Sequence, residues 1–134
     1  MITAVDTNVL IDVGVEDAAR ARAAAQALEA CASEGRLVVC DVVLAEFARG
    51  FPPDEDPARW IRDFGIAYDP ILEETAVEAG RIHARYSERS GQRSRRTVAD
   101  LLIGAHALLQ ANRLLTRDRG FFRDYFRGLK VVIT

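Results

Sequence analysis

The sequence predicts an α/β protein with a parallel sheet at its centre. Short aliphatic and β-branched runs alternate with stretches of helical periodicity along the whole chain, which is typical of a parallel sheet covered by helices. The 134 residues are 49% hydrophobic and 28% charged, as expected for one globular domain with its own core. No internal repeat or low-complexity linker divides the chain, so we expect a single domain over residues 1–134.

Five short strands are expected. Each is a run of three or four mainly apolar residues bounded by turn residues or by helix caps. The weakest of them is the third. These runs cover residues 2–5, 37–40, 66–68, 113–116 and 130–133.

Caps and apolar periodicity predict the helices between these strands. Thr7 and Asn8 can cap a short helix after the first strand, and Asp41 can cap the helix after the second. Gly35 is a suitable C-terminal stop for the alanine-rich helix before it. The expected helices cover residues 7–13, 17–33, 42–47, the surroundings of Trp60, 73–88 and 97–109.

The formal net charge of −2 conceals an asymmetry along the chain. Residues 1–80 carry a balance of −10, whereas residues 81–134 carry +8. The last third can therefore form a basic face that attracts a polyanion. Cys31 and Cys40 have no metal-binding or redox spacing, and we expect both to be buried thiols.

Four acidic residues lie where side chains are presented rather than packed. Asp6 ends the first strand and Asp118 follows the fourth, while Glu46 and Asp100 lie in helical stretches. Ligands of open parallel sheets bind beyond the carboxyl ends of the strands, so Asp6 and Asp118 would meet there if these strands are neighbours. Converging carboxylates repel one another unless a cation lies between them. The pattern predicts a metal site for phosphodiester chemistry.

Each acid also has a purely structural alternative. Asp6 could cap the helix that follows it, and Asp100 could form a capping box with Thr97. Glu46 could be a solvated helix residue, and Asp118 a turn residue before a glycine.

Four motifs in order resemble a PIN-domain ribonuclease, and most closely the VapC-type toxins of type II toxin–antitoxin systems. These motifs are residues 6–8 (DTN), 43–47 (VLAEF), 98–103 (VADLLI) and 116–121 (TRDRGF). The resemblance covers essentially the whole chain. It implies a Rossmann-like fold with sheet order 3-2-1-4-5 and RNA cleavage that leaves a 5′-phosphate and a 3′-hydroxyl. It also implies a Mg²⁺ or Mn²⁺ site whose ligands and catalytic residues are Asp6, Glu46, Asp100 and Asp118.

Further residues are expected around these acids. Asn8 and Thr116 could orient the carboxylates or a metal-bound water, or could simply cap a helix and bond at a strand end. Nearby arginines could contact RNA phosphates or form a solvated face: Arg93, Arg95, Arg96, Arg117, Arg119 and Arg123. His83 and His106 lie in helical patterns, and we expect structural roles for both.

The resemblance implies two protein partners, a second copy of the chain and a small antitoxin. The C-terminal segment of the antitoxin would lie in a groove over the acidic site, for which Phe51, Trp60, Ile61 and Phe64 are candidates, although core packing is an alternative for each. With neither a signal peptide nor a membrane span in the sequence, a cytoplasmic location is expected.

Three other functions compete with the nuclease. A phosphatase of the haloacid dehalogenase type also begins with an Asp after its first strand, but it needs a second Asp where this chain has Asn8. A response-regulator receiver is disfavoured in the same way, because this chain lacks the paired acids that a receiver needs near the end of its first strand. A non-catalytic RNA-binding or protein-binding module on the same fold remains, but it would gain nothing from four mutually repelling acids.

Overall fold

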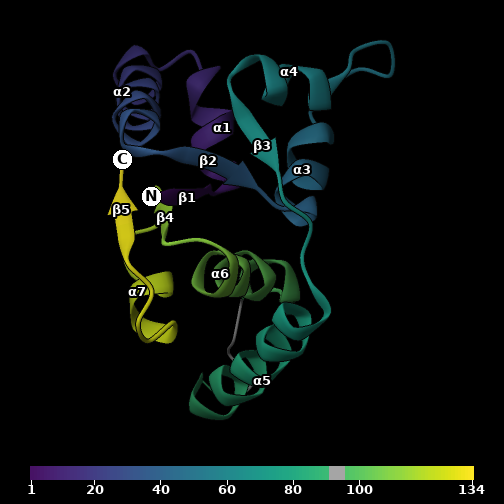
Figure 1. Cartoon of the computed structure of the whole chain (residues 1–134), viewed down its shortest axis with the longest axis vertical. Helices are drawn as coiled ribbons and strands as arrows, with labels where there is room; N and C mark the ends of the chain where they lie inside the picture. Colours follow the sequence, from purple (N-terminus) through teal and green to yellow (C-terminus); the bar gives the residue numbers. More distant parts are fainter. Residues whose placement is uncertain (91–95) are drawn as a thin grey trace.

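A five-stranded parallel sheet forms the centre of the molecule (Figure 1). The computed structural model describes residues 1–90 and 96–134. The strands are β1 (Ile2–Val5), β2 (Arg36–Val39), β3 (Ile66–Tyr68), β4 (Arg113–Thr116) and β5 (Val131–Ile133). Their order is β3-β2-β1-β4-β5, and every neighbouring pair is parallel. This confirms the expected α/β class and sheet order.

Helices cover both faces of the sheet. Figure 1 shows the first four on one side of it and the last three on the other. Within the described residues the helices are α1 (Thr7–Val13), α2 (Ala18–Glu34), α3 (Asp41–Ala48), α4 (Pro57–Asp63), α5 (Glu73–Ser90), α6 (Val98–Gln110) and α7 (Phe121–Tyr125). None of them is long and apolar enough to cross a membrane.

Three local expectations were wrong. Asp6, rather than Thr7 or Asn8, caps α1, because its carboxylate accepts a hydrogen bond from the Thr7 backbone N–H at 2.7 Å. Cys40 is the N-cap of α3, and Asp41 instead accepts a hydrogen bond from the Ile71 backbone N–H at 3.2 Å. Helix α7 was not expected at all.

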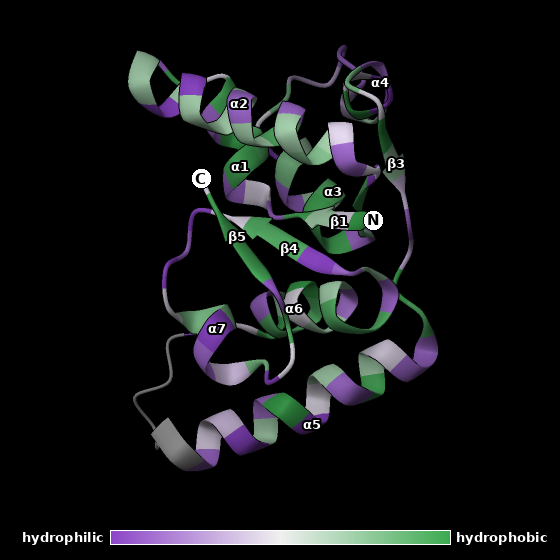
Figure 2. Ribbon diagram, turned by 60° about the vertical axis from the view of Figure 1, so that its left-hand side comes forward, coloured by the Kyte–Doolittle hydropathy of each residue, from purple (hydrophilic) through white to green (hydrophobic). Residues whose placement is uncertain are grey.

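Helix α6 is buried between the sheet and α5. It is apolar around most of its circumference, whereas α5 alternates between polar and apolar residues, as Figure 2 shows. A helix that is apolar all round must be covered on more than one side. Gly104 of α6 lies so close to the Phe126 ring that a side chain at this position would overlap it. The absence of a side chain therefore lets the segment after α7 pack against α6.

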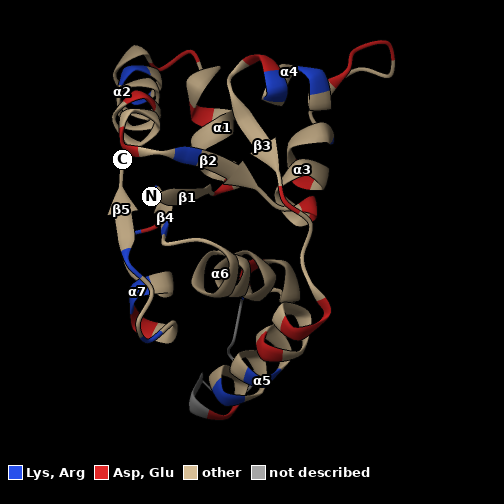
Figure 3. Cartoon of the chain, in the orientation of Figure 1, with Lys and Arg blue, Asp and Glu red and all other residues tan. Residues whose placement is uncertain are grey.

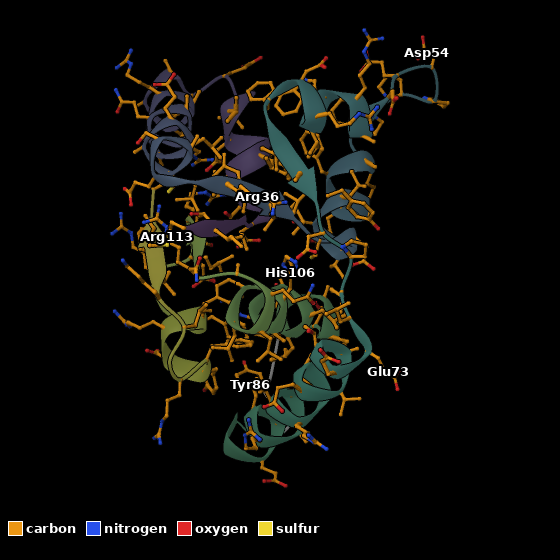
Figure 4. All side chains as sticks on the ribbon, viewed as in Figure 1. Arg36, Asp54, Glu73, Tyr86, His106 and Arg113 are labelled. Atoms are coloured by element: carbon orange, nitrogen blue, oxygen red, sulfur yellow. The ribbon has the colours of Figure 1, made fainter. Side chains whose placement is uncertain are left out.

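The histidines and cysteines lie where structural residues are expected. His106 on α6 (Figure 4) is 1% exposed, and its Nε2 lies 2.9 Å from Asp69 Oδ2 in the segment after β3. His83 is half-buried on α5. Cys31 and Cys40 are free and buried, as expected.

Candidate functional site

Asp6 lies at the carboxyl end of β1 with both of its carboxylate oxygens hydrogen-bonded. Oδ1 accepts from the Thr7 backbone N–H, and Oδ2 accepts from Thr116 Oγ1 at 2.7 Å and from Asn8 Nδ2 at 3.2 Å. Strands β1 and β4 are neighbours, which brings Thr116 to Asp6. The side chain is 6% exposed. Asn8 and Thr116 thus fix the orientation of this carboxylate.

The pKa of Asp6 is raised from 3.8 to about 6. Burial is the main cause, because a desolvated carboxyl group favours its neutral form. The hydrogen bonds from Thr116 and Thr7 oppose this rise, whereas the negative charges of Glu46 and Asp100 add to it. Other acids therefore lie close enough to Asp6 to make its ionisation more costly.

Glu46 is joined to Asp6 through Thr7, the first residue of α1. Thr7 Oγ1 donates a hydrogen bond to Glu46 Oε1 at 2.6 Å, while the Thr7 backbone N–H bonds to Asp6. One residue thus holds two acids from different parts of the chain. Only a capping role was expected for Thr7, and its contact with Glu46 was not expected.

Asp100 and Asp118 also have local hydrogen bonds. Asp100 Oδ2 accepts from the Thr97 backbone N–H at 3.2 Å and from the Thr97 hydroxyl at 3.3 Å, so it does contribute to the cap of α6. Asp118 Oδ1 accepts from the backbone N–H groups of Gly120 and Phe121. Its Oδ2 accepts from Arg96 Nη2 at 2.7 Å. The structural alternatives for these two acids are therefore present in the fold.

The pKa of Asp118 moves in the opposite direction to that of Asp6. Partial burial alone would raise it. The hydrogen bonds from Gly120 and Phe121, with the hydrogen bond and charge of Arg96, outweigh burial and hold the pKa below 3.8. Of the four acids, Asp118 is therefore the one whose negative charge is already compensated, by Arg96.

All four acids line one pocket. Its volume is about 270 Å³, and Thr7, Asn8, Ile11, Arg49, Arg96 and Phe122 complete its wall. Arg49 was not expected here, although it lies three residues after Glu46 and so on the same side of the chain as it leaves α3. The pocket brings together side chains from α1, α3, α6 and the segment after β4.

The chemistry of this pocket suits a hard divalent cation. Its acidic donors are all oxygens, which Mg²⁺ and Mn²⁺ prefer. The raised pKa of Asp6 indicates that positive charge placed nearby would stabilise its ionised form. Within the described residues, however, no three Asp, Glu, His or Cys side chains are already gathered as a metal cluster. The four acids therefore fit such an ion in two respects: they supply oxygen ligands, and they line the same pocket.

The arginines named from the sequence have different surroundings. Arg96 lines the acidic pocket. Arg117 is paired through Nε with the buried Asp12 at 2.7 Å, and Arg119 is exposed. Arg123 is exposed and pairs with Asp124. Figure 3 shows basic segments around α7 and at the start of β5, as the charge asymmetry predicts. Arg93 and Arg95 lie outside the described residues.

An apolar groove adjoins the acidic pocket. Its volume is about 480 Å³, and it shares Ile11, Glu46 and Arg49 with that pocket. Phe51 and Trp60 line it, as expected. The remaining two candidates do not: Ile61 is 2% exposed in the core, and Phe64 stacks against Trp60 with ring centroids 3.9 Å apart.

Comparisons with known proteins agree with the observed fold. The model of the PIN domain family matches residues 3–126. A search of curated proteins gave no match.

Solved structures with the same fold include a toxin–antitoxin complex. The chain is similar to the VapBC2 structure from Rickettsia felis, bound to a promoter DNA fragment, with a TM-score of 0.76, 18% identity and coverage of 100% of this chain and 99% of that one. It also resembles a toxin–antitoxin complex from Klebsiella pneumoniae, with a TM-score of 0.70, 24% identity and coverage of 97% and 95%. For FitAcB from Neisseria gonorrhoeae the TM-score is 0.62, with 21% identity and coverage of 98% and 96%.

Proposed function

The chain belongs to the PIN domain family, and from that premise we propose that it is a metal-dependent endoribonuclease and the toxin of a toxin–antitoxin pair. The observation that carries the proposal is the pocket shared by Asp6, Glu46, Asp100 and Asp118. These acids come from four separate segments, and gathering them without a cation costs stability, as the raised pKa of Asp6 indicates. A bound cation would offset that cost.

Three of the acids are the proposed ligands of a Mg²⁺ or Mn²⁺ ion: Asp6, Glu46 and Asp100. When bound, such an ion polarises the scissile phosphate and lowers the pKa of an attacking water. The protein holds the ligands in position, since Thr116 and Asn8 fix Asp6 and Thr7 fixes Glu46. Arginines at the pocket would bind the RNA backbone, because a guanidinium matches the phosphate group in both shape and charge.

We assign the apolar groove to the antitoxin. The similar structure from Klebsiella pneumoniae is a toxin–antitoxin complex. A segment with an apolar face could pack on Phe51 and Trp60, and a basic side chain on it could reach Glu46 at the junction with the acidic pocket. Occupation of this groove would block access to the acids. A homodimer acting in the cytoplasm completes the proposal.

The competing functions fit the pocket less well. A phosphatase of the haloacid dehalogenase type needs a second carboxyl group at position 8, where Asn8 instead donates to Asp6 and accepts from the Arg117 backbone N–H. A non-catalytic module on this fold has no need of the four acids, because it would bind RNA as readily if they were replaced.

A cleavage assay tests the proposal. The purified protein is incubated with a mixture of single-stranded RNAs and Mg²⁺ or Mn²⁺, and the 5′ ends of the products are mapped. We expect cleavage at discrete positions that EDTA abolishes and that Asp6→Asn lacks. Binding of RNA without cleavage under both metals would instead favour the non-catalytic module.

A further inference from the structure

Both carboxylate oxygens of Asp118 are already engaged by the protein. Oδ1 accepts from the backbone N–H groups of Gly120 and Phe121 at 3.0 and 2.9 Å, and Oδ2 accepts from Arg96 Nη2 at 2.7 Å. The bonds to Oδ1 close the turn that leads into α7, so the carboxylate is fixed in place. Asp6 also accepts three hydrogen bonds, but none of these three partners is charged. Asp118 differs because its Oδ2 faces a guanidinium, and a metal ion bound to that oxygen would be repelled by this positive charge.

The Arg96 guanidinium is held on a second side by an aromatic ring. Its Cζ lies 4.3 Å from the centroid of the Phe121 ring, and Phe121 is 6% exposed. Since Asp118 also binds the Phe121 backbone, the acid and the ring that hold Arg96 form one local unit. A cation held between a carboxylate and a ring face loses little entropy when it binds a ligand.

Arg96 has donors to spare and faces the other acids across the same pocket. A guanidinium carries five N–H donors, and the bond to Asp118 uses one nitrogen. Asp6, Glu46 and Asp100 line that pocket too, so an entering phosphate would meet three negative charges there. The positive charge of Arg96 in the wall of the pocket offsets part of that repulsion.

We propose that Arg96 binds a non-bridging oxygen of the scissile phosphate, and that Asp118 is a positioning residue for Arg96 rather than a metal ligand. This inference rests on the proposed nuclease function. It assigns metal binding to Asp6, Glu46 and Asp100 alone. Asp118 differs from these three because it is paired with Arg96.

Metal binding tests the assignment of Asp118 without any need for activity. Mn²⁺ affinity is measured by calorimetry for the parent, Asp118→Asn, Arg96→Ala and Asp100→Asn. The asparagine keeps the oxygen that accepts from Gly120 and Phe121, so the turn is retained. We expect Asp118→Asn and Arg96→Ala to bind within about threefold of the parent, and Asp100→Asn to lose at least tenfold. A tenfold loss in Asp118→Asn would overturn the inference.

Kinetics test the link between the two residues. We expect Arg96→Ala and Asp118→Asn each to lower kcat by about a hundredfold with little change in KM, as for the loss of one donor to a developing charge. The double variant should be no slower than Arg96→Ala, and Arg96→Lys should recover part of the rate. Arg127→Ala, which removes an exposed arginine elsewhere, should match the parent.

The outcomes separate this inference from the proposed function. Multiplying losses in the double variant, or parental kcat in Arg96→Ala, would overturn the inference and leave the nuclease intact. A parent protein that cleaves no RNA with either metal would overturn the proposed function, and the phosphate role of Arg96 with it. The metal affinities would still decide whether Asp118 is a ligand.

Discussion

Thr116 Oγ1 donates a hydrogen bond to Asp6 Oδ2 at 2.7 Å across a separation of 110 residues. The same hydroxyl accepts a hydrogen bond from the Asp118 backbone N–H at 3.0 Å. A single side chain at the end of β4 therefore orients the acid at the end of β1 and fixes the start of the segment that carries the fourth acid. This arrangement depends on the direct pairing of β1 with β4.

Without metal, the protein should become more stable as the pH is lowered from about 7 towards 4. The pKa of Asp6 is about 6 in the folded protein against 3.8 as its ordinary value, so between these values the folded state binds more protons than the unfolded state. Stability that this group contributes at low pH is lost as the pH rises through 6. The difference amounts to roughly 3 kcal/mol. Urea unfolding in EDTA at several pH values measures it.

Asp6→Asn is the matched control for that pH dependence. The amide cannot ionise, so the rise in unfolding free energy below pH 7 should largely disappear, and the variant should exceed the parent in stability at pH 7. Asp118 cannot mimic the effect, because its pKa lies below 3.8 and acts with the opposite sign at lower pH. An unchanged pH profile in Asp6→Asn would show that another group titrates.

Mg²⁺ or Mn²⁺ should raise the melting temperature of the parent protein. An ion that binds only the folded state stabilises it by about 2.7 kcal/mol at a hundred times its Kd, which is several degrees for a chain of this size. Asp6→Asn and Asp100→Asn should respond weakly. Asp124→Asn removes an exposed acid on α7 and should respond like the parent. Identical responses from all four proteins would place the ion elsewhere.

Thr7→Val should slow RNA cleavage by tenfold to a hundredfold, roughly the effect of losing a residue that orients a metal ligand. Valine keeps the size of threonine and the backbone N–H that bonds to Asp6, but it lacks the hydroxyl that holds Glu46 at 2.6 Å. Thr7→Ser restores that hydroxyl and should retain most activity. Initial rates and Mn²⁺ affinity measure the effect, and equal values for Thr7→Val and the parent would refute this role of Thr7.

Gly104→Ala and Gly80→Ala should change stability in opposite directions. A methyl group at position 104 would overlap the Phe126 ring, and overpacking of this kind costs about 1–3 kcal/mol. At position 80 on α5 a methyl group meets nothing within 4 Å, and alanine favours a helix by up to about 1 kcal/mol. Urea unfolding of both variants compares them directly. Equal stabilities would mean that the Phe126 ring moves aside without cost.

The strands and the acids could be predicted from the sequence because both depend on local pattern. Short apolar runs predicted the sheet, and the acids that follow two of them pointed to the edge that carries the acidic pocket. Helix α7 could not be found in this way. It has only five residues, and two of them, Phe121 and Phe122, are held by burial in the core. Isolated helices of that length are not stable in water.

The partners of individual side chains were also beyond the sequence. Thr7 faces Glu46 only because α1 packs beside α3, and Arg96 meets Asp118 only because the segment before α6 lies beside the one after β4. Arg49 was within reach, since a spacing of three residues from Glu46 predicts a shared side. Two caps were misplaced because Asp6 itself caps α1 through the Thr7 backbone N–H, and because Asp41 bonds to the Ile71 backbone instead of capping α3.

The position of β1 between β2 and β4 has a consequence for the time at which the acidic pocket can form. Asp6 and Glu46 leave the ribosome early, but the hydroxyl that orients Asp6 belongs to a strand that follows most of the chain. A nascent polypeptide thus cannot assemble the complete pocket until β4 and the segment that follows it have been synthesised. The chemistry of these residues is delayed by the order of synthesis alone.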